Sequence, residues 1–164
     1  MIPRTIFTPE HEMFRSSVQR FIAEYVSPFH ADWEKAGQVP RELWQQAGEL
    51  GLLCCNVPAV YGGMGGDFLH STILIEEFAA AGATGPTFYL HSDIVAPYLV
   101  DFGSEAQKQA WLPRMARGEI VVALGMSEPS GGSDVQAMRT QAIRDGDDYV
   151  INGQKVFITN GHTA

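Results

Sequence analysis

Two hydroxyl side chains bracket a glycine-rich loop in the segment LGMSEPSGGSDV, residues 124–135. Ser127 stands at the start of this loop and Ser133 near its end, with Gly131 and Gly132 between them. Glycine lets a ligand approach the backbone closely, and successive N–H groups in such a loop can form an anion-binding nest. The pattern therefore predicts a site for a phosphate or a polar heterocycle, with an ordinary surface turn as the alternative.

The glycine spacing excludes two common phosphate-binding motifs. No Gly-Lys-Ser or Gly-Lys-Thr follows the loop, so it is not a P-loop. The spacing also departs from the G-x-G-x-x-G fingerprint of dinucleotide-binding folds, and no clear helix follows. If the ligand is anionic, its charge must therefore be met by backbone N–H groups or by a few local cations.

The charge composition of the chain bears on which classes of molecule it can bind. The 164 residues carry 19 acids against 11 Lys and Arg, a net charge of −8, and contain no basic block. We therefore expect no nucleic acid and no membrane as partner. The opening residues, MIPRTIFTPEHEMF, lack a signal or transit pattern, which predicts a cytoplasmic protein, or a mitochondrial matrix protein whose presequence has been removed.

The two cysteines, Cys54 and Cys55, are adjacent in the sequence. A disulfide between neighbours would strain the backbone, so we expect both to be reduced and buried. No histidine lies close enough in sequence to suggest a metal clip, and no metal site is predicted.

Residues 1–119 have the pattern of an all-helical domain. Thr8 is expected to cap a helix that starts at Pro9, ends before Pro28 and buries one face. That face comprises Phe14, Val18, Phe21 and Tyr25. Further helices are predicted over residues 30–36, 40–50 (with Leu43, Ala47 and Leu50 on one side), 68–82 after an Asp67 cap, about 87–102, and 104–117 with a Ser104–Gln107 capping box.

After Gly118 the sequence pattern changes from helical to strand-like. Residues 119–126, EIVVALGM, are apolar and β-branched. Further on, Asp145-Gly146 and Asn152-Gly153 are two turn signals with strand-like runs between them, and YVI-NG-QKVFI at 149–158 has the signature of a compact hairpin. The predicted fold class is α+β: an N-terminal all-α helical domain (1–119) followed by the first antiparallel strands of a β-domain (120–164). A sheet of two or three strands rarely buries its own apolar face. We therefore expect this chain to be the N-terminal piece of a longer protein.

Two motifs in this order resemble the acyl-CoA dehydrogenase family. The flavin loop of that family has the form Thr-Glu-Pro-x-x-Gly-Ser-Asp, which ALGMSEPSGGSD matches at 123–134. Its next strand carries Asn-Gly, then Lys, an aromatic, Ile, Thr or Ser, and Asn, which INGQKVFITNG matches at 151–161. The resemblance covers the whole chain, and residues 6–37 and 51–68 look most like the long-chain branch.

The resemblance implies an FAD site. The residues that it places at the flavin are Leu124, Met126, Ser127, Gly132, Ser133, Phe157, Ile158 and Thr159. Ser127 replaces the more common Thr and keeps its hydroxyl for the pyrimidine edge of the flavin. Phe157, often Trp in the family, would lie against the isoalloxazine, and the Thr159 hydroxyl would reach N5. Ser133 would also lie near the acyl-CoA chain.

The implied activity is FAD-dependent α,β-dehydrogenation of an acyl-CoA thioester to trans-2-enoyl-CoA, as in fatty acid oxidation. Implied partners are an electron-transfer flavoprotein and further copies of the chain in a homotetramer. The family's glutamate base lies in its C-terminal domain, so we expect no catalytic residue in this chain and no activity from it alone. The alternatives are a flavin oxidase of the same fold, of acyl-CoA oxidase or nitroalkane-oxidising type, and a non-catalytic interaction module.

Several other side chains are chemically reactive or could bind ligands, but we expect them to have structural roles or to face solvent. Glu76 and Glu77 are adjacent and point about 100° apart on a helix, which predicts a solvated face instead of a carboxylate pair. His91 is expected to be a satisfied histidine of the core or surface, although in the family its helix borders the acyl-chain cavity. The tryptophans are expected to pack between helices.

Overall fold

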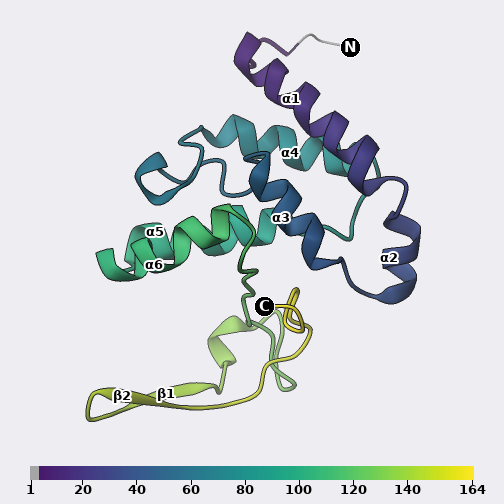
Figure 1. The fold of residues 1–164 in the computed structure, drawn as a ribbon. Coiled ribbons are helices and arrows are strands. Elements are labelled where there is room, and N and C mark those ends of the chain that lie inside the picture. The colour runs from purple at the N-terminus through teal and green to yellow at the C-terminus, as the bar shows by residue number, and fades with distance from the viewer. Residues whose placement is uncertain (1–3) are drawn as a thin grey trace. The chain divides into compact units, whose positions relative to one another are not determined.

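A computed structural model describes residues 4–164 and divides them into two compact units (Figure 1). The helical unit extends to Val121, and the loop-and-hairpin unit runs from Val122 to Ala164. A helical N-terminal part followed by two antiparallel strands confirms the predicted fold class. Within residues 4–164, each helix is too short or too polar to cross a lipid bilayer.

The first helix, α1 (Pro9–Phe21), begins at the predicted Thr8 cap and runs into a π-helical turn at Ile22–Val26. The wider turn adds a residue and shifts the buried stripe by one position. Val26 is therefore fully buried, whereas Tyr25, which the α-helical spacing places on the buried face, is 36% exposed. The prediction for Tyr25 is wrong for this reason.

The remaining helical elements follow the predicted order. They are α2 (His30–Ala36), α3 (Arg41–Glu49), α4 (Phe68–Ala80), a π-helical segment at Leu90–Val95, α5 (Ala96–Phe102) and α6 (Glu105–Ala116), with 3-10 turns at Ala59–Tyr61 and Val135–Ala137. Asp67 caps α4, and Ser104 forms a capping box with Gln107 at the start of α6. Both helix starts were predicted from these polar residues.

Aromatic rings fill the centre of the helical unit. Trp44 is 3% exposed and meets the Phe88 ring edge-on with centroids 4.8 Å apart. His91 is fully buried against Trp44 and lies with Nε2 3.1 Å from the Met115 carbonyl oxygen, so the core interpretation of this histidine is confirmed. Trp111, in contrast, is 48% exposed.

The C-terminal end of α3 meets the end of α6 backbone to backbone. A Cβ at Gly118 would lie 2.1 Å from the Trp44 carbonyl oxygen, and one at Gly48 would lie 2.3 Å from the Arg117 carbonyl carbon. Only glycine allows this approach. Leu50, which the helical spacing places on the same side as the buried Leu43 and Ala47, lies at the C-cap and is exposed, because the regular helix already ends at Glu49.

Helix α1 packs against α4 (Figure 1). An ion-pair cluster joins the two helices. One guanidinium nitrogen of Arg15 lies 2.6 Å from a Glu77 carboxylate oxygen and 3.3 Å from a Glu76 oxygen. The prediction of a solvated face for this acidic pair is therefore wrong. Adjacent carboxylates that point apart on α4 can still reach one guanidinium nitrogen, because that nitrogen carries two N–H donors.

The hairpin of the second unit forms at Asp145-Gly146, the first of the two predicted turn signals, and not at Asn152-Gly153. Strand β1 (Gln141–Asp145) pairs antiparallel with β2 (Asp148–Asn152), from Gln141↔Asn152 to Asp145↔Asp148, around an Asp-Gly turn. The predicted hairpin turn at Asn152-Gly153 is wrong. A Cβ at Gly153 would lie 2.2 Å from the Thr140 hydroxyl oxygen, so this glycine serves close packing.

The strand predicted over residues 119–126 is irregular backbone in the structure. A strand needs a continuous ladder of backbone hydrogen bonds. One such bond joins the residue that follows this stretch to the QKVFI stretch, from the Val156 N–H to the Ser127 carbonyl oxygen at 3.0 Å. Apolar β-branched residues indicated extended backbone, but no ladder forms between these segments.

Candidate functional site

The glycine-rich loop presents a run of unpaired backbone donors. From Leu124 to Ser127, four successive N–H groups make no hydrogen bond to any atom of residues 4–164. Leu124 and Ser127 are half-buried, and Met126 is exposed. Because an unpaired polar group on half-buried backbone is costly, such a run is typical of a surface that meets a ligand or another part of a protein.

A tight turn closes the loop behind these donors. The N–H of Glu128 donates to the Gly131 carbonyl oxygen at 3.0 Å, and the Gly131 N–H donates back to Glu128 at 3.1 Å. Gly132 and Ser133 follow the turn and are exposed. A Cβ at Gly132 would meet no atom within 4 Å, so the backbone there is open to an approaching group.

The second motif holds an aromatic side chain in an unusual conformation. Phe157 has a positive φ of 56°, and its side chain is 95% exposed. A left-handed conformation costs a non-glycine residue about 1–2 kcal/mol, and such strain is concentrated at ligand sites. Ile158 is half-buried and Thr159 exposed, and the Asn160 amide donates to the Val122 carbonyl oxygen at 3.3 Å.

A buried carboxylate joins the two motifs. Glu128 accepts the backbone N–H groups of Arg139 at 2.7 Å and Thr140 at 3.0 Å, and its Oε1 lies 2.9 Å from Lys155 Nζ. The Thr140 side chain, the Arg139 N–H and the Lys155 ammonium hold the pKa of Glu128 well below its usual range. The carboxylate is therefore ionised at neutral pH.

Sequence reasoning missed this pair, although each motif contains one of its members. The available signal was an acidic residue in the first motif, which also contains Asp134, and a single basic residue in the second. The Lys155 side chain lies along the loop, because a Cβ at Gly125 would come within 3.2 Å of its Cγ. The structure thus brings residues 124–128 beside residues 155–158.

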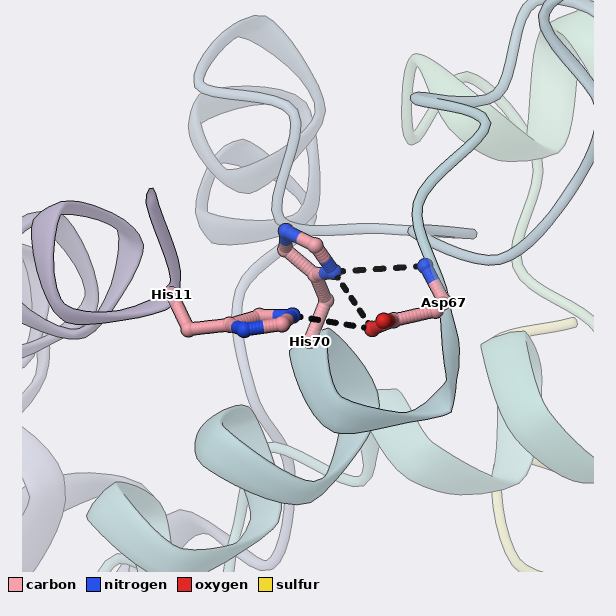
Figure 2. A group of neighbouring side chains, drawn as sticks. All are labelled: His11, Asp67 and His70. Atoms are coloured by element: carbon pink, nitrogen blue, oxygen red, sulfur yellow. Dashed lines mark hydrogen bonds and ion pairs between the residues drawn. The ribbon is translucent and has the colours of Figure 1, made fainter. Parts of the chain in front are cut away.

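One cluster in residues 4–164 has side chains of the type and proximity that can hold a metal ion: His11, Asp67 and His70 (Figure 2). His11 Nε2 lies 3.1 Å from Asp67 Oδ1, and His70 Nδ1 lies 2.9 Å from the same oxygen. Both rings are buried. The two histidines occupy the third positions of α1 and α4, each beside a helix cap.

The hydrogen bonds at these caps already use both ring nitrogens of His11 and the Nδ1 of His70. The Thr8 N–H donates to His11 Nδ1 at 3.1 Å, and the Asp67 N–H donates to His70 Nδ1 at 3.2 Å. These partners assign the proton of His11 to Nε2, which donates to Asp67. We therefore interpret the cluster as a staple between two helix starts.

The adjacent cysteines are buried, as predicted. Cys54 is fully buried, and its N–H donates to the Ser92 hydroxyl at 2.9 Å. Burial raises the pKa of each thiol to about 12. Because the thiolate is the reactive form, Cys54 and Cys55 are poor nucleophiles in the folded chain.

The sequence was also compared with protein-family models and with known proteins. Residues 8–119 match the family model for the acyl-CoA dehydrogenase N-terminal domain, and residues 123–164 match that for the middle domain. The mitochondrial long-chain specific acyl-CoA dehydrogenase of Sus scrofa is 52% identical over 158 residues, which are 96% of this chain and 37% of that protein. The mitochondrial isovaleryl-CoA dehydrogenase of Bos taurus is 39% identical, over 94% of this chain and 37% of its own length.

Solved structures show the same likeness. An acyl-CoA dehydrogenase from Geobacillus kaustophilus aligns with a TM-score of 0.92 and 43% identity, over 97% of this chain and 42% of that one. A glutaryl-CoA dehydrogenase from Mycobacterium smegmatis in complex with FADH2 aligns with a TM-score of 0.90 and 30% identity, over 96% and 41%. The chain thus spans about two fifths of these relatives.

Proposed function

The chain belongs to the acyl-CoA dehydrogenase family, and from this premise we propose that it forms part of an FAD-dependent oxidoreductase that converts an acyl-CoA thioester to trans-2-enoyl-CoA. The run of unpaired N–H groups from Leu124 to Ser127 carries the proposal. Donors fixed in advance stabilise charge that develops during a reaction. In this reaction FAD, when bound, would supply the hydride acceptor.

The donor set fits the polar edge of a flavin. The N–H groups of Leu124, Met126 and Ser127, with the Ser127 hydroxyl, would face the pyrimidine ring, which becomes negative when the flavin is reduced. Gly132 and Ser133 would lie near the pyrophosphate, where the open backbone at Gly132 leaves room for it. Ser133 would also contact the acyl-CoA substrate.

The second motif would supply the aromatic side of the site. Phe157 would lay its exposed ring against the isoalloxazine, with Ile158 beside it, and the Thr159 hydroxyl would donate to flavin N5. The support from the chain is the high exposure of Phe157 at a strained φ, because a ring held in solvent at an energetic cost calls for a partner.

No acid of residues 4–164 is proposed as the catalytic base. Glu128 is buried in an ion pair, and Asp93, whose pKa burial raises, belongs to the helical unit. We place the base in a further part of the full-length protein. The proposal also includes a helical domain at 1–119, the start of a β-domain at 120–164, an electron-transfer flavoprotein as acceptor and a homotetrameric assembly.

An anaerobic titration of the full-length protein tests this function. Purified protein should show the visible absorption of bound flavin, and an acyl-CoA should bleach it in proportion to the enoyl-CoA formed. Reoxidation by an electron-transfer flavoprotein but not by O2 is expected, and fast reoxidation by O2 would instead support the oxidase alternative. A protein without flavin, or a flavin that acyl-CoA thioesters do not bleach, would contradict the proposal.

A further inference from the structure

We propose that Glu128 and Lys155 are positioning residues that fix the separation between the donor loop at residues 124–127 and the aromatic segment at residues 157–159. This inference rests on the proposed function, since the two segments are assigned there to opposite parts of one flavin site. Neither residue need touch the flavin. Both act through the backbone that they hold.

The first observation is that Glu128 is the centre of its unit. Among residues 122–164 it is the only buried residue, and its side chain is 4% exposed. A buried carboxylate costs free energy unless donors surround it. Two backbone N–H groups and one ammonium do so here, which makes a charge, and not an apolar core, the organising element of this unit.

The second observation is that Lys155 contacts the loop twice. Its ammonium donates to the Met126 carbonyl oxygen at 3.0 Å and to Glu128 Oε1 at 2.9 Å, and it lies 3.4 Å from Met138 Sδ. The carbonyl bond turns the Met126 C=O toward Lys155. Because a peptide unit is planar, this also fixes the direction of the following Ser127 N–H.

The third observation is the short path from the pair to the proposed ligand groups. Ser127 directly precedes Glu128, and Phe157 follows Lys155 by two residues. The intervening Val156 donates its N–H to the Ser127 carbonyl oxygen at 3.0 Å. Loss of the Lys155 ammonium removes its bonds to both Met126 and Glu128 and leaves this backbone hydrogen bond to join residues 124–128 to residues 155–158, so both segments would be held less firmly.

A set of matched variants tests the inference. Lys155→Met removes the ammonium and keeps the stem, and Glu128→Gln keeps an acceptor for the backbone N–H groups. Lys155→Arg restores a cation. Lys35→Met, a change of the same kind on an exposed lysine of α2, is the control.

The first readout needs no flavin. In the 164-residue chain, amide hydrogen exchange at Arg139 and Thr140 should quicken by about tenfold or more in Lys155→Met, because the carboxylate that they bind loses its third partner. Lys155→Arg should exchange at a rate nearer the wild type. Unchanged exchange in both Lys155→Met and Glu128→Gln would overturn the inference.

The second readout is FAD binding by the full-length protein. We expect the Kd for FAD to rise by about tenfold or more in Lys155→Met and Glu128→Gln, with an altered visible circular dichroism of the remaining bound flavin. The double variant should lose less than the sum of the two, as residues that act together do. Lys35→Met should match the wild type.

The outcomes separate the two proposals. If the wild-type protein binds no FAD, the proposed function fails, and the positioning role fails with it. If the wild type binds FAD, and the pair variants exchange faster but keep its affinity and its circular dichroism, only the positioning role is overturned. A merely structural pair would lower stability without changing the signature of bound flavin.

Discussion

Ser127 and Thr159 each carry a hydroxyl that makes no hydrogen bond within residues 4–164. If both donate to flavin, then Ser127→Ala and Thr159→Val should each weaken flavin or transition-state binding by about 1–3 kcal/mol, the usual cost of an orphaned partner. Fluorescence titration of the full-length apoprotein with FAD, and the rate of flavin bleaching, measure the two effects.

Ser130→Ala is the matched control for the loop hydroxyl. Ser130 lies in the same loop, is exposed and falls at a variable position of the family motif. Its loss should leave both FAD affinity and rate unchanged. Wild-type affinity and rate in both Ser127→Ala and Thr159→Val would show that these hydroxyls were given the wrong role.

His91 makes the stability of the helical unit sensitive to acid. Burial lowers its pKa from 6.5 to about 4, so the unfolded chain binds more protons between these values. The free energy of unfolding should therefore fall as pH drops from 6.5 toward 4, by up to about 1.4 kcal/mol per pH unit. Urea unfolding at several pH values measures this slope.

His91→Gln isolates the contribution, because glutamine keeps a donor for the Met115 carbonyl and does not titrate. The variant should be less stable at neutral pH and should show a flatter dependence between pH 6.5 and 4. Asp93, whose pKa is raised by burial, acts in the opposite direction and is present in both proteins. Equal slopes for wild type and variant would contradict the assignment.

The role of a single residue could be predicted from the sequence where its partners lie within a few residues of it. Asp67 and Ser104 were identified as helix caps because a cap binds backbone a few residues away. Glu128 was missed because its partners lie 11 to 27 residues further on. The contact of Glu76 and Glu77 with Arg15 depends on how α1 packs on α4, which spacing within α4 does not show.

At the scale of elements, the backbone contact between α3 and the end of α6 gives a sharp prediction. Gly118→Ala should destabilise the helical unit by about 3 kcal/mol or more, because the new methyl meets the Trp44 carbonyl and the φ of +66° is unfavourable for alanine. Thermal denaturation followed by circular dichroism measures the loss.

Gly82→Ala separates the two causes. Gly82 has nearly the same φ, +65°, but a methyl there would meet no atom within 4 Å. This variant should lose only the conformational part, about 1–2 kcal/mol. Equal stability of the two variants would show that the close backbone approach of α3 and α6 adds no steric cost at residue 118 and would contradict this prediction.

Helices were easier to predict than strands for a physical reason. A helix satisfies its hydrogen bonds within one segment, so caps and periodicity in the sequence mark it. A strand depends on a partner, and the stretches 119–126 and 154–158 form no ladder with each other. The hairpin instead uses the Asp145-Gly146 turn, while Gly153 is required by its contact with Thr140.

At the scale of the whole molecule, much apolar surface is exposed. In the hairpin, all ten strand residues are exposed, including the cross-strand pair Ile143 and Val150. Two-stranded hairpins with open edges and apolar side chains favour association. We therefore predict that the isolated 164-residue chain self-associates, binds FAD weakly or not at all, and does not turn over acyl-CoA.

Sedimentation velocity over a range of protein concentrations checks the association. Ile143→Thr with Val150→Thr should reduce it, because threonine keeps the preference for strand and removes apolar surface. Val60→Thr, a similar change at an exposed site of the helical unit, is the control. A wild-type chain that stays monomeric, or a yellow chain that oxidises acyl-CoA, would contradict this prediction.

Cys54 and Cys55 are the only thiols in the sequence, and burial keeps both protonated up to strongly alkaline pH. For maleimide chemistry at neutral pH the folded chain therefore behaves as a cysteine-free background. A cysteine introduced at exposed Ser130 would take up a fluorophore alone, with no need to mutate the native pair. Fluorescence from the loop could then report whether the 164-residue chain binds a ligand.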